Sequence, residues 1–126
     1  MSILKRGRKM KISIKQLGNK ALNEQRELDE AWATTIKARD NWRCAICGND
    51  YAPNAHHIVP RENKQFRYEL DNGISLCLVH HKFNRVISAH NNPFAFFLWL
   101  QRFNPIFFSA AVGRNREMLR QAGISV

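Results

Sequence analysis

The chain has 126 residues, enough for one domain with a modest core and too few for two independent domains of ordinary size. Its 20 Lys and Arg residues against 10 Asp and Glu give a net charge of +10, which suits a polyanion: nucleic acid first, an anionic membrane surface second. No apolar run approaches the roughly 20 residues of a membrane span, and no long apolar stretch follows the basic N-terminus. The composition therefore excludes a membrane-spanning or secreted class and favours a cytoplasmic protein.

The N-terminal segment carries much of this charge. Residues 1–23 hold seven basic side chains and no acid, and Gly7 and Gly18 interrupt a stretch that is sparse in apolar residues. The segment is therefore predicted to be a flexible basic arm, extended or partly disordered. Four of its cations are expected to contact nucleic acid: Lys5, Arg6, Arg8 and Lys9.

Residues 24–126 are predicted to form a single domain that begins with a helix over 24–39. Asn23 can cap its start, and Leu28, Trp32 and Ile36 recur every four residues, which is the spacing of one helix face. The acidic run 24–30 is interpreted as the solvated side of this helix and receives no role in a site.

The middle of the chain changes character after residue 39. Turn-forming pairs such as Asp40-Asn41 and Asn72-Gly73 recur at short intervals, and only brief strands are expected between them, at 57–59 and 74–76. Helical spacing returns over 76–87. Mixed short strands and helices predict an α+β fold with a motif core over 39–87.

Residues 88–126 are predicted to form a helical tail. Asn92-Pro93 and Asn104-Pro105 each combine a capping residue with proline at the first helical position, and the last helix should end near Gly123. The segment 94–108 is apolar on two helix faces. It is interpreted as core, with a surface for a second copy of the chain or for a larger partner as the alternative.

All three cysteines and four of the five histidines fall between residues 44 and 81. An odd number of cysteines argues against a disulfide framework. Cys44-x-x-Cys47 is the spacing of a zinc knuckle, and Cys77-x-x-His80 would share one helix face 29 residues later. The four side chains predict a closed tetrahedral zinc site with a structural role.

Four histidines remain to be explained. His56 and His57 are neighbours in an expected strand, so their side chains should point to opposite faces, and His81 should point away from the zinc ligand His80. One of the paired histidines could then meet His81. The alternative is that His56 or His57 is a zinc ligand or a surface side chain. His90 stands alone before the tail and is predicted to be merely exposed.

Together these residues resemble the signature of the HNH endonucleases. The resemblance runs over about residues 39–85, from the Cys44 knuckle through His56-His57-Ile-Val-Pro60 and Leu70-Asp-Asn72-Gly-Ile-Ser-Leu-Cys77 to His80-His81-Lys82. In overall size and in its helical tail the chain is similar to the small phage proteins of this family, which implies a bacterial or phage-infected cell. It also implies a ββα-metal core flanked by the first helix and the tail.

The resemblance further implies a mechanism on double-stranded DNA. His57 would be the general base, because it takes the second place of the paired histidines, and a neutral imidazole can accept a proton from water near pH 7. His56 and His81 would hold one catalytic divalent cation, Mg²⁺, Mn²⁺ or another transition metal. Asn72 would hold the loop beside the strand that carries the base, although a turn-forming Asn before Gly73 explains it equally well. Hydrolysis would leave a 5′-phosphate.

The sequence also departs from the family pattern. The second knuckle has His80 where a cysteine is commoner, and no histidine follows His81 by one turn, where Asn84 and Arg85 stand. Water and phosphate oxygens would then complete the metal shell. Four cations are candidate phosphate contacts, with ordinary solvated charges as the alternative for the first three: Arg61, Lys64, Arg67 and Arg85.

Two functions of other classes also fit the sequence. A zinc-stapled DNA-binding module without catalysis needs only the four zinc ligands and the basic arm. An accessory subunit that docks its aromatic tail on a larger partner is the other alternative. The first leaves the positions of His56, His57 and His81 without a reason, whereas the second is compatible with nuclease activity.

Overall fold

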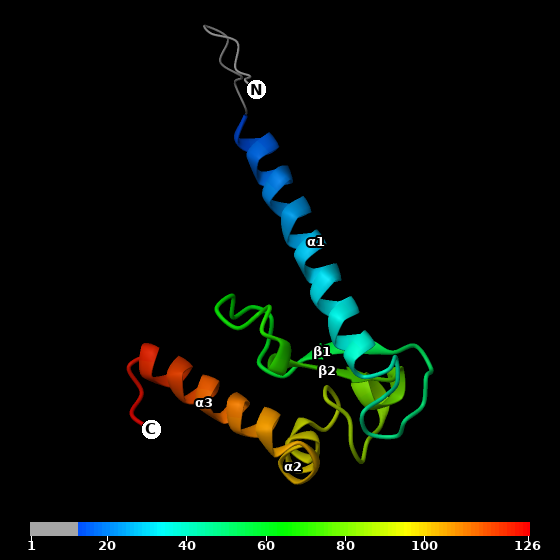
Figure 1. Cartoon of the computed structure of the whole chain (residues 1–126). Helices are drawn as coiled ribbons and strands as arrows, with labels where there is room; N and C mark the ends of the chain where they lie inside the picture. The colour runs from blue at the N-terminus through cyan, green and yellow to red at the C-terminus, as the bar shows by residue number, and fades with distance from the viewer. Residues whose placement is uncertain (1–12) are drawn as a thin grey trace, which may run out of the picture.

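A computed structural model of the chain describes residues 13–126 and combines helices with one small sheet (Figure 1). In chain order the elements are α1 (Ile14–Arg39), β1 (Asn54–His57), the 3₁₀ turn η1 (Leu70–Asn72), β2 (Gly73–Leu76), the π-helical turn η2 (Val79–Phe83), α2 (Pro93–Phe103) and α3 (Pro105–Gln121). The predicted α+β class is confirmed. Lys5, Arg6, Arg8 and Lys9 lie outside the described residues.

Helix α1 begins ten residues earlier than the sequence predicted. The Ser13 hydroxyl accepts from the Gln16 amide at 3.1 Å and the Gln16 side chain accepts from the Ser13 amide at 2.8 Å, which forms a capping box. Gly18 in the helix interior costs only about 1 kcal/mol relative to alanine, too little to end it. The prediction of a flexible arm was therefore wrong for residues 14–23, and this half of α1 projects away from the rest of the fold (Figure 1).

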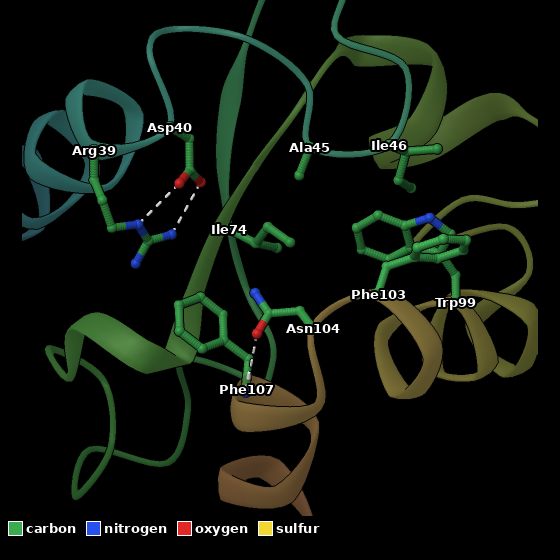
Figure 2. Close-up of a pocket in the computed structure, with 9 residues that line it drawn as sticks. All are labelled: Arg39, Asp40, Ala45, Ile46, Ile74, Trp99, Phe103, Asn104 and Phe107. Carbon is green, nitrogen blue, oxygen red and sulfur yellow. Dashed lines mark hydrogen bonds and ion pairs between the residues drawn. The ribbon is translucent and has the colours of Figure 1, made fainter.

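The C-terminal end of α1 is tied to the sheet by Arg39 and Asp40. The Arg39 guanidinium donates to both Asp40 carboxylate oxygens at 2.9 Å (Figure 2). It also donates to the carbonyls of Leu70 and Gly73 at 2.7 Å. Asp40 in turn accepts from the backbone amide of Ser75 at 2.8 Å. These bonds fix the direction in which the chain leaves α1 toward the cysteine knuckle.

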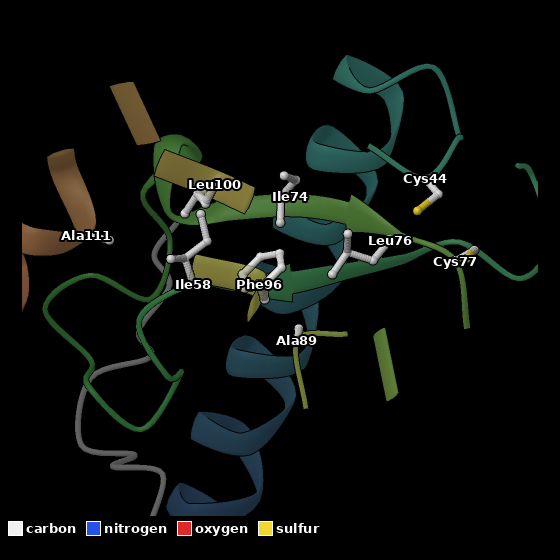
Figure 3. Packing of buried hydrophobic residues seen from close by; sticks show 9 residues of the cluster. All are labelled: Cys44, Ile58, Ile74, Leu76, Cys77, Ala89, Phe96, Leu100 and Ala111. Carbon is white, nitrogen blue, oxygen red and sulfur yellow. The ribbon is translucent and has the colours of Figure 1, made fainter. Parts of the chain in front are cut away.

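The sheet has two antiparallel strands, with His56 opposite Ile74 and His57 opposite Gly73. Opposed residues in an antiparallel pair point to the same face. Ile74 and Leu76 point into the main core with Phe96 and Leu100 of α2 (Figure 3). Gly73 lies on the other face, under Trp32 and Ile36 of α1. The sheet is thus covered by α2 on one face and by α1 on the other, and His56 and His57 fall on opposite sides.

The helical tail follows its sequence signals. Asn92 accepts from the Ala95 amide and Asn104 from the Phe107 amide, both at 3.2 Å, and each is followed by proline at the first helical position. The two helices and their boundaries confirm the prediction. One face of α2 is core, whereas Phe94 is 75 % exposed, so the proposed contact with a second chain or a partner stays a prediction.

The segment after β2 differs from the continuous helix predicted over 76–87. Only residues 78–83 are helical, five of them in η2, and Asn84 adopts an extended backbone. The Asn84 side chain accepts from the amides of Val86 and Ile87 at 2.9 Å, which turns the chain back on itself. Within residues 13–126, none of the helices combines the length and the apolar character that a membrane crossing would require.

Candidate metal centres and the adjoining cleft

Four side chains converge where the knuckle meets the end of β2. We call them the Cys₃His cluster: Cys44, Cys47, Cys77 and His80. The Cys47 and Cys77 sulfurs lie 3.9 Å apart, and the His80 Nδ1 lies 3.7 Å from the Cys44 sulfur and 3.4 Å from the Cys77 sulfur. Tetrahedral zinc with Zn–S of about 2.3 Å and Zn–N of about 2.0–2.1 Å requires edges of roughly 3.8 Å and 3.6 Å. The cluster could therefore hold a metal ion such as zinc.

The local sequence explains this geometry. The Gly48 amide donates to the Cys44 carbonyl at 2.8 Å, and the Cys44 amide donates to the Asn49 carbonyl at 2.8 Å, so the knuckle is a tight turn. Gly48 has φ +75°, a conformation that a residue with a Cβ adopts only at a cost. Cys44 and Cys77 are each 3 % exposed, while Cys47 is exposed at the rim.

Three imidazoles converge on the other side of η2. We call His56, His81 and His90 the three-histidine cluster, and one nitrogen of each lies within 4.8 Å of the others. The Nε2 atoms of His81 and His90 are 3.1 Å apart, close to the roughly 3.0 Å between two nitrogens bound to one ion at about 2.1 Å and a right angle. The Nδ1 of His81 is buried without a hydrogen-bond partner among the described residues. These nitrogens fit the donor set of a divalent transition metal.

His90 is the candidate metal ligand that sequence reasoning missed. It is exposed, as predicted, but the turn after Asn84 lays residues 89 and 90 along η2, where their amides donate to the carbonyls of His80 and His81 at 2.9 Å and 3.0 Å. The His90 ring then stacks edge-on against His81, with centroids 4.7 Å apart. The sequence signal was the spacing of nine residues between His81 and His90. A continuous helix over 76–87 would have carried His90 out of reach of His81.

Burial keeps two of these imidazoles neutral. Burial first, and then the neighbouring His81 and His90, lower the pKa of His56 to about 3. Burial and the neighbouring His90 and Lys82 lower the pKa of His81 to about 4. A metal binds the lone pair of a neutral imidazole, so both side chains are in their ligand form at neutral pH.

His57 points the other way, toward α1. Its ring stacks on the indole of Trp32 with centroids 3.8 Å apart and planes tilted by 10°. Its Nε2 lies 3.0 Å from the Arg67 carbonyl. Partial burial lowers the pKa of His57, and the hydrogen bond to that carbonyl opposes the shift. The imidazole is therefore neutral at pH 7 and able to accept a proton.

Asn72 is fully buried and bridges the loop that links the two strands. Its Oδ1 accepts from the Val59 amide at 2.8 Å, and its Nδ2 donates to the carbonyls of Val59 and Phe66 at 3.1 Å. Its own carbonyl accepts from the Ile58 amide at 2.9 Å. One side chain thus holds the backbone directly after His57.

His56 and His57 line one cleft of about 910 Å³ even though they lie on opposite faces of β1, because His57 is the last residue of the strand. His81, His90, Arg61 and Lys82 also line it, with Phe96 and Phe97 forming an apolar wall. Lys64 and Arg85 are exposed. The cleft combines neutral imidazoles with cations at its rim.

Arg67 stands apart from the other predicted phosphate contacts. It is only 9 % exposed, and its Nε and Nη2 donate to the two Asp29 carboxylate oxygens at 2.8 Å and 2.7 Å. That contact raises the pKa of Arg67 and lowers the pKa of Asp29. The guanidinium is thus engaged within the fold, which differs from the expected role in binding a phosphate.

Comparisons with protein family models, curated proteins and solved structures find no match for this chain.

Proposed function

We propose that this protein is a metal-dependent endonuclease of the HNH type that hydrolyses phosphodiester bonds in double-stranded DNA. The observation that carries the proposal is a single cleft lined both by the three-histidine cluster and by the neutral imidazole of His57. A DNA-binding module without catalysis gives no reason for four histidines at these positions. The +10 net charge suits the polyanionic substrate.

The donor set fits a catalytic divalent cation. His56, His81 and His90 would hold it, and a cation bound there supplies Lewis-acid stabilisation of the charge that develops on the scissile phosphate and the leaving oxygen. Three protein ligands leave further positions for water and phosphate oxygens, and imidazole nitrogens favour a transition metal over Mg²⁺. His90 supplies the third nitrogen that the sequence analysis expected to be replaced by water.

The chain's own residues supply the proton transfer and the alignment. His57 accepts a proton from the water that attacks phosphorus, and the bond to the 3′-oxygen breaks as that oxygen takes up a proton from solvent. The products carry a 5′-phosphate and a 3′-hydroxyl. Asn72 keeps the loop after His57 in place through its three side-chain hydrogen bonds. Arg61, Lys64, Lys82 and Arg85 are the exposed cations that we assign to the DNA backbone.

The Cys₃His cluster would hold a structural zinc ion. Four protein ligands leave no vacancy at a tetrahedral ion, which is the arrangement of structural rather than catalytic zinc. The elements β1, β2 and η2 would then form the ββα-metal core that the resemblance implies, with η2 as a shortened version of its helix. His80 and His81 would direct the two ions to opposite sides of η2.

A supercoiled-plasmid nicking assay tests the proposal. The native chain should convert supercoiled into open-circular DNA with Mg²⁺ or Mn²⁺ and not with EDTA. His57→Ala should lose activity by at least about a hundredfold while its circular dichroism and zinc content stay native, because general-base catalysis contributes about 10²–10⁴-fold. Gln101→Ala, an exposed residue of α2, is the control and should cut like the native chain.

Two outcomes would contradict catalysis. Equal cutting by the native chain and His57→Ala would indicate a contaminating nuclease. A native chain that shifts DNA in a gel but cuts it with none of Mg²⁺, Mn²⁺, Co²⁺, Ni²⁺ or Zn²⁺ would favour the zinc-stapled DNA-binding module instead.

A further inference from the structure

Helix α1 does more than cover one face of the sheet, because its Trp32 contacts His57 directly. Trp32 is 5 % exposed, its indole nitrogen donates to the Glu69 carbonyl at 3.0 Å, and its ring lies flat against His57. A Cβ at Gly73, the residue opposite His57, would lie 2.8 Å from Ile36 and closer still to Trp32. The absence of a side chain at Gly73 therefore lets the indole reach the imidazole.

The hydrogen-bond partner of His57 is also held by a residue of α1. The carbonyl that pairs with His57 Nε2 belongs to Arg67, whose guanidinium donates to both oxygens of Asp29 and, at 3.2 Å, to the Arg61 carbonyl. A planar guanidinium paired with a carboxylate through two parallel bonds has one orientation. Asp29 thus fixes the Arg67 backbone, and through it the partner of the imidazole.

We infer that Asp29, Trp32 and Arg67, which we call the α1 clamp, are positioning residues that hold His57 in one orientation and one tautomer. The inference rests on the proposed function. A carbonyl can only accept, so the paired Nε2 carries the proton and the lone pair of the neutral ring is left on Nδ1. The flat stack on Trp32 then restricts rotation of the ring. None of the three residues belongs to either ligand cluster.

Matched variants of the clamp provide the test. Trp32→Phe keeps an aromatic plane and Trp32→Leu removes it, while Asp29→Glu keeps the charge and Asp29→Asn removes it. The expected result is a fall in single-turnover cleavage of about ten- to a hundredfold for Trp32→Leu and Asp29→Asn, with smaller losses for the conservative partners. KM for DNA and Mn²⁺ affinity at the three-histidine cluster should stay native. Glu27→Gln, an exposed acid on the same helix, should change nothing.

A second measurement does not depend on activity. Nitrogen-15 spectra of the imidazoles in the zinc-loaded chain should show His57 as a single Nε2–H tautomer, and Asp29→Asn should show a mixture of tautomers. A single tautomer that persists in both Asp29→Asn and Trp32→Leu, together with unchanged cleavage per folded molecule, would overturn the inference. If the native chain does not cut DNA, the proposed function fails, and the spectra alone decide whether the clamp orients His57.

Discussion

The two ligand clusters share the short turn η2, where His80 faces one and His81 faces the other, yet they differ in every other respect. The Cys₃His cluster brings four ligands from two knuckle-like segments, and two of its cysteines are 3 % exposed. The three-histidine cluster brings three ligands from β1, η2 and the turn before α2, and it opens into the cleft. One cluster has four ligands and is closed, whereas the other has three and is open to the cleft.

This difference suits the two clusters of a small domain to separate roles, one in folding and one in ligand exchange. A closed thiolate site can supply folding energy without contacting solvent, which matters in a chain of 126 residues with a modest core. An open imidazole site can exchange ligands, which catalysis requires. We therefore expect ligand losses at the first cluster to appear as unfolding, and ligand losses at the second to appear as weaker binding of the ion that we propose it holds.

The largest expected effect is at the closed cluster. Cys77→Ala removes one of four ligands, and structural zinc supplies on the order of 10 kcal/mol of apparent folding energy, comparable to the whole stability of a domain. The variant should therefore be unfolded at 25 °C, as measured by circular dichroism and by loss of bound zinc in native mass spectrometry. Chelation of zinc from the native chain should have the same effect. A folded, zinc-free Cys77→Ala would refute the structural assignment.

A substitution that changes neither cluster gives a reference for the stability lost through poor packing alone. Gly73→Ala places a methyl group against Trp32 and Ile36, and such overpacking costs about 1–3 kcal/mol. Its urea midpoint should fall while zinc content stays at one ion per folded chain. Gly113→Ala is the matched control, because a Cβ there meets no atom within 4 Å and α3 gains helix propensity. Equal midpoints for the two variants would contradict the close packing of α1 on the sheet.

The third prediction tests metal binding at the open cluster while the closed cluster stays intact. His90→Ala removes an exposed side chain, so its stability and zinc content should be native. Mn²⁺ binding at the open cluster should weaken at least about tenfold, since even outer partners of metal ligands are worth about 10- to 100-fold in affinity. Isothermal titration of the zinc-loaded chain measures this, with Gln101→Ala as the control. Native Mn²⁺ affinity in His90→Ala would remove this residue from the site.

The sequence predicted the closed cluster completely and the open cluster only in part. The Cys-x-x-Cys and Cys-x-x-His spacings are short enough that local geometry alone brings each pair together. His90 required a chain reversal whose cause is the Asn84 side chain capping the amides of Val86 and Ile87. No periodic pattern in the sequence reports such a bond. The continuous helix expected over 76–87 was wrong for the same reason.

Outside the motif core, too, sequence reasoning succeeded where the interaction is local and failed where it joins distant residues. Asn-Pro pairs predicted the starts of α2 and α3 correctly, because capping is a local interaction. The start of α1 was missed because basic charge and Gly18 predicted a flexible arm over residues 1–23, whereas the Ser13 capping box starts a helix within it. The contacts of Asp29 and Trp32 with Arg67 and His57 join residues 25 to 38 positions apart. Helical periodicity could place Trp32 on the buried face of α1, but it could not identify what the indole would meet.

The smallest expected effect lies outside both clusters, at the ion pair between Asp29 and Arg67. Arg67 lowers the pKa of Asp29, so the carboxylate contributes stability that is complete above its unfolded pKa of 3.8 and is lost as the pH falls through its lower folded pKa. Asp29→Asn should therefore reduce the free energy of unfolding by about 1 kcal/mol at pH 7, since part of the pair is open to solvent. Because both pKa values lie below pH 5, the gap between native and variant urea midpoints should stay constant from pH 7 to about 5. Glu27→Gln should show no gap at any pH in this range. A gap that closed between pH 7 and 5 would mean that the carboxylate takes up its proton there, and that the Arg67 carbonyl beside His57 is held by some other contact.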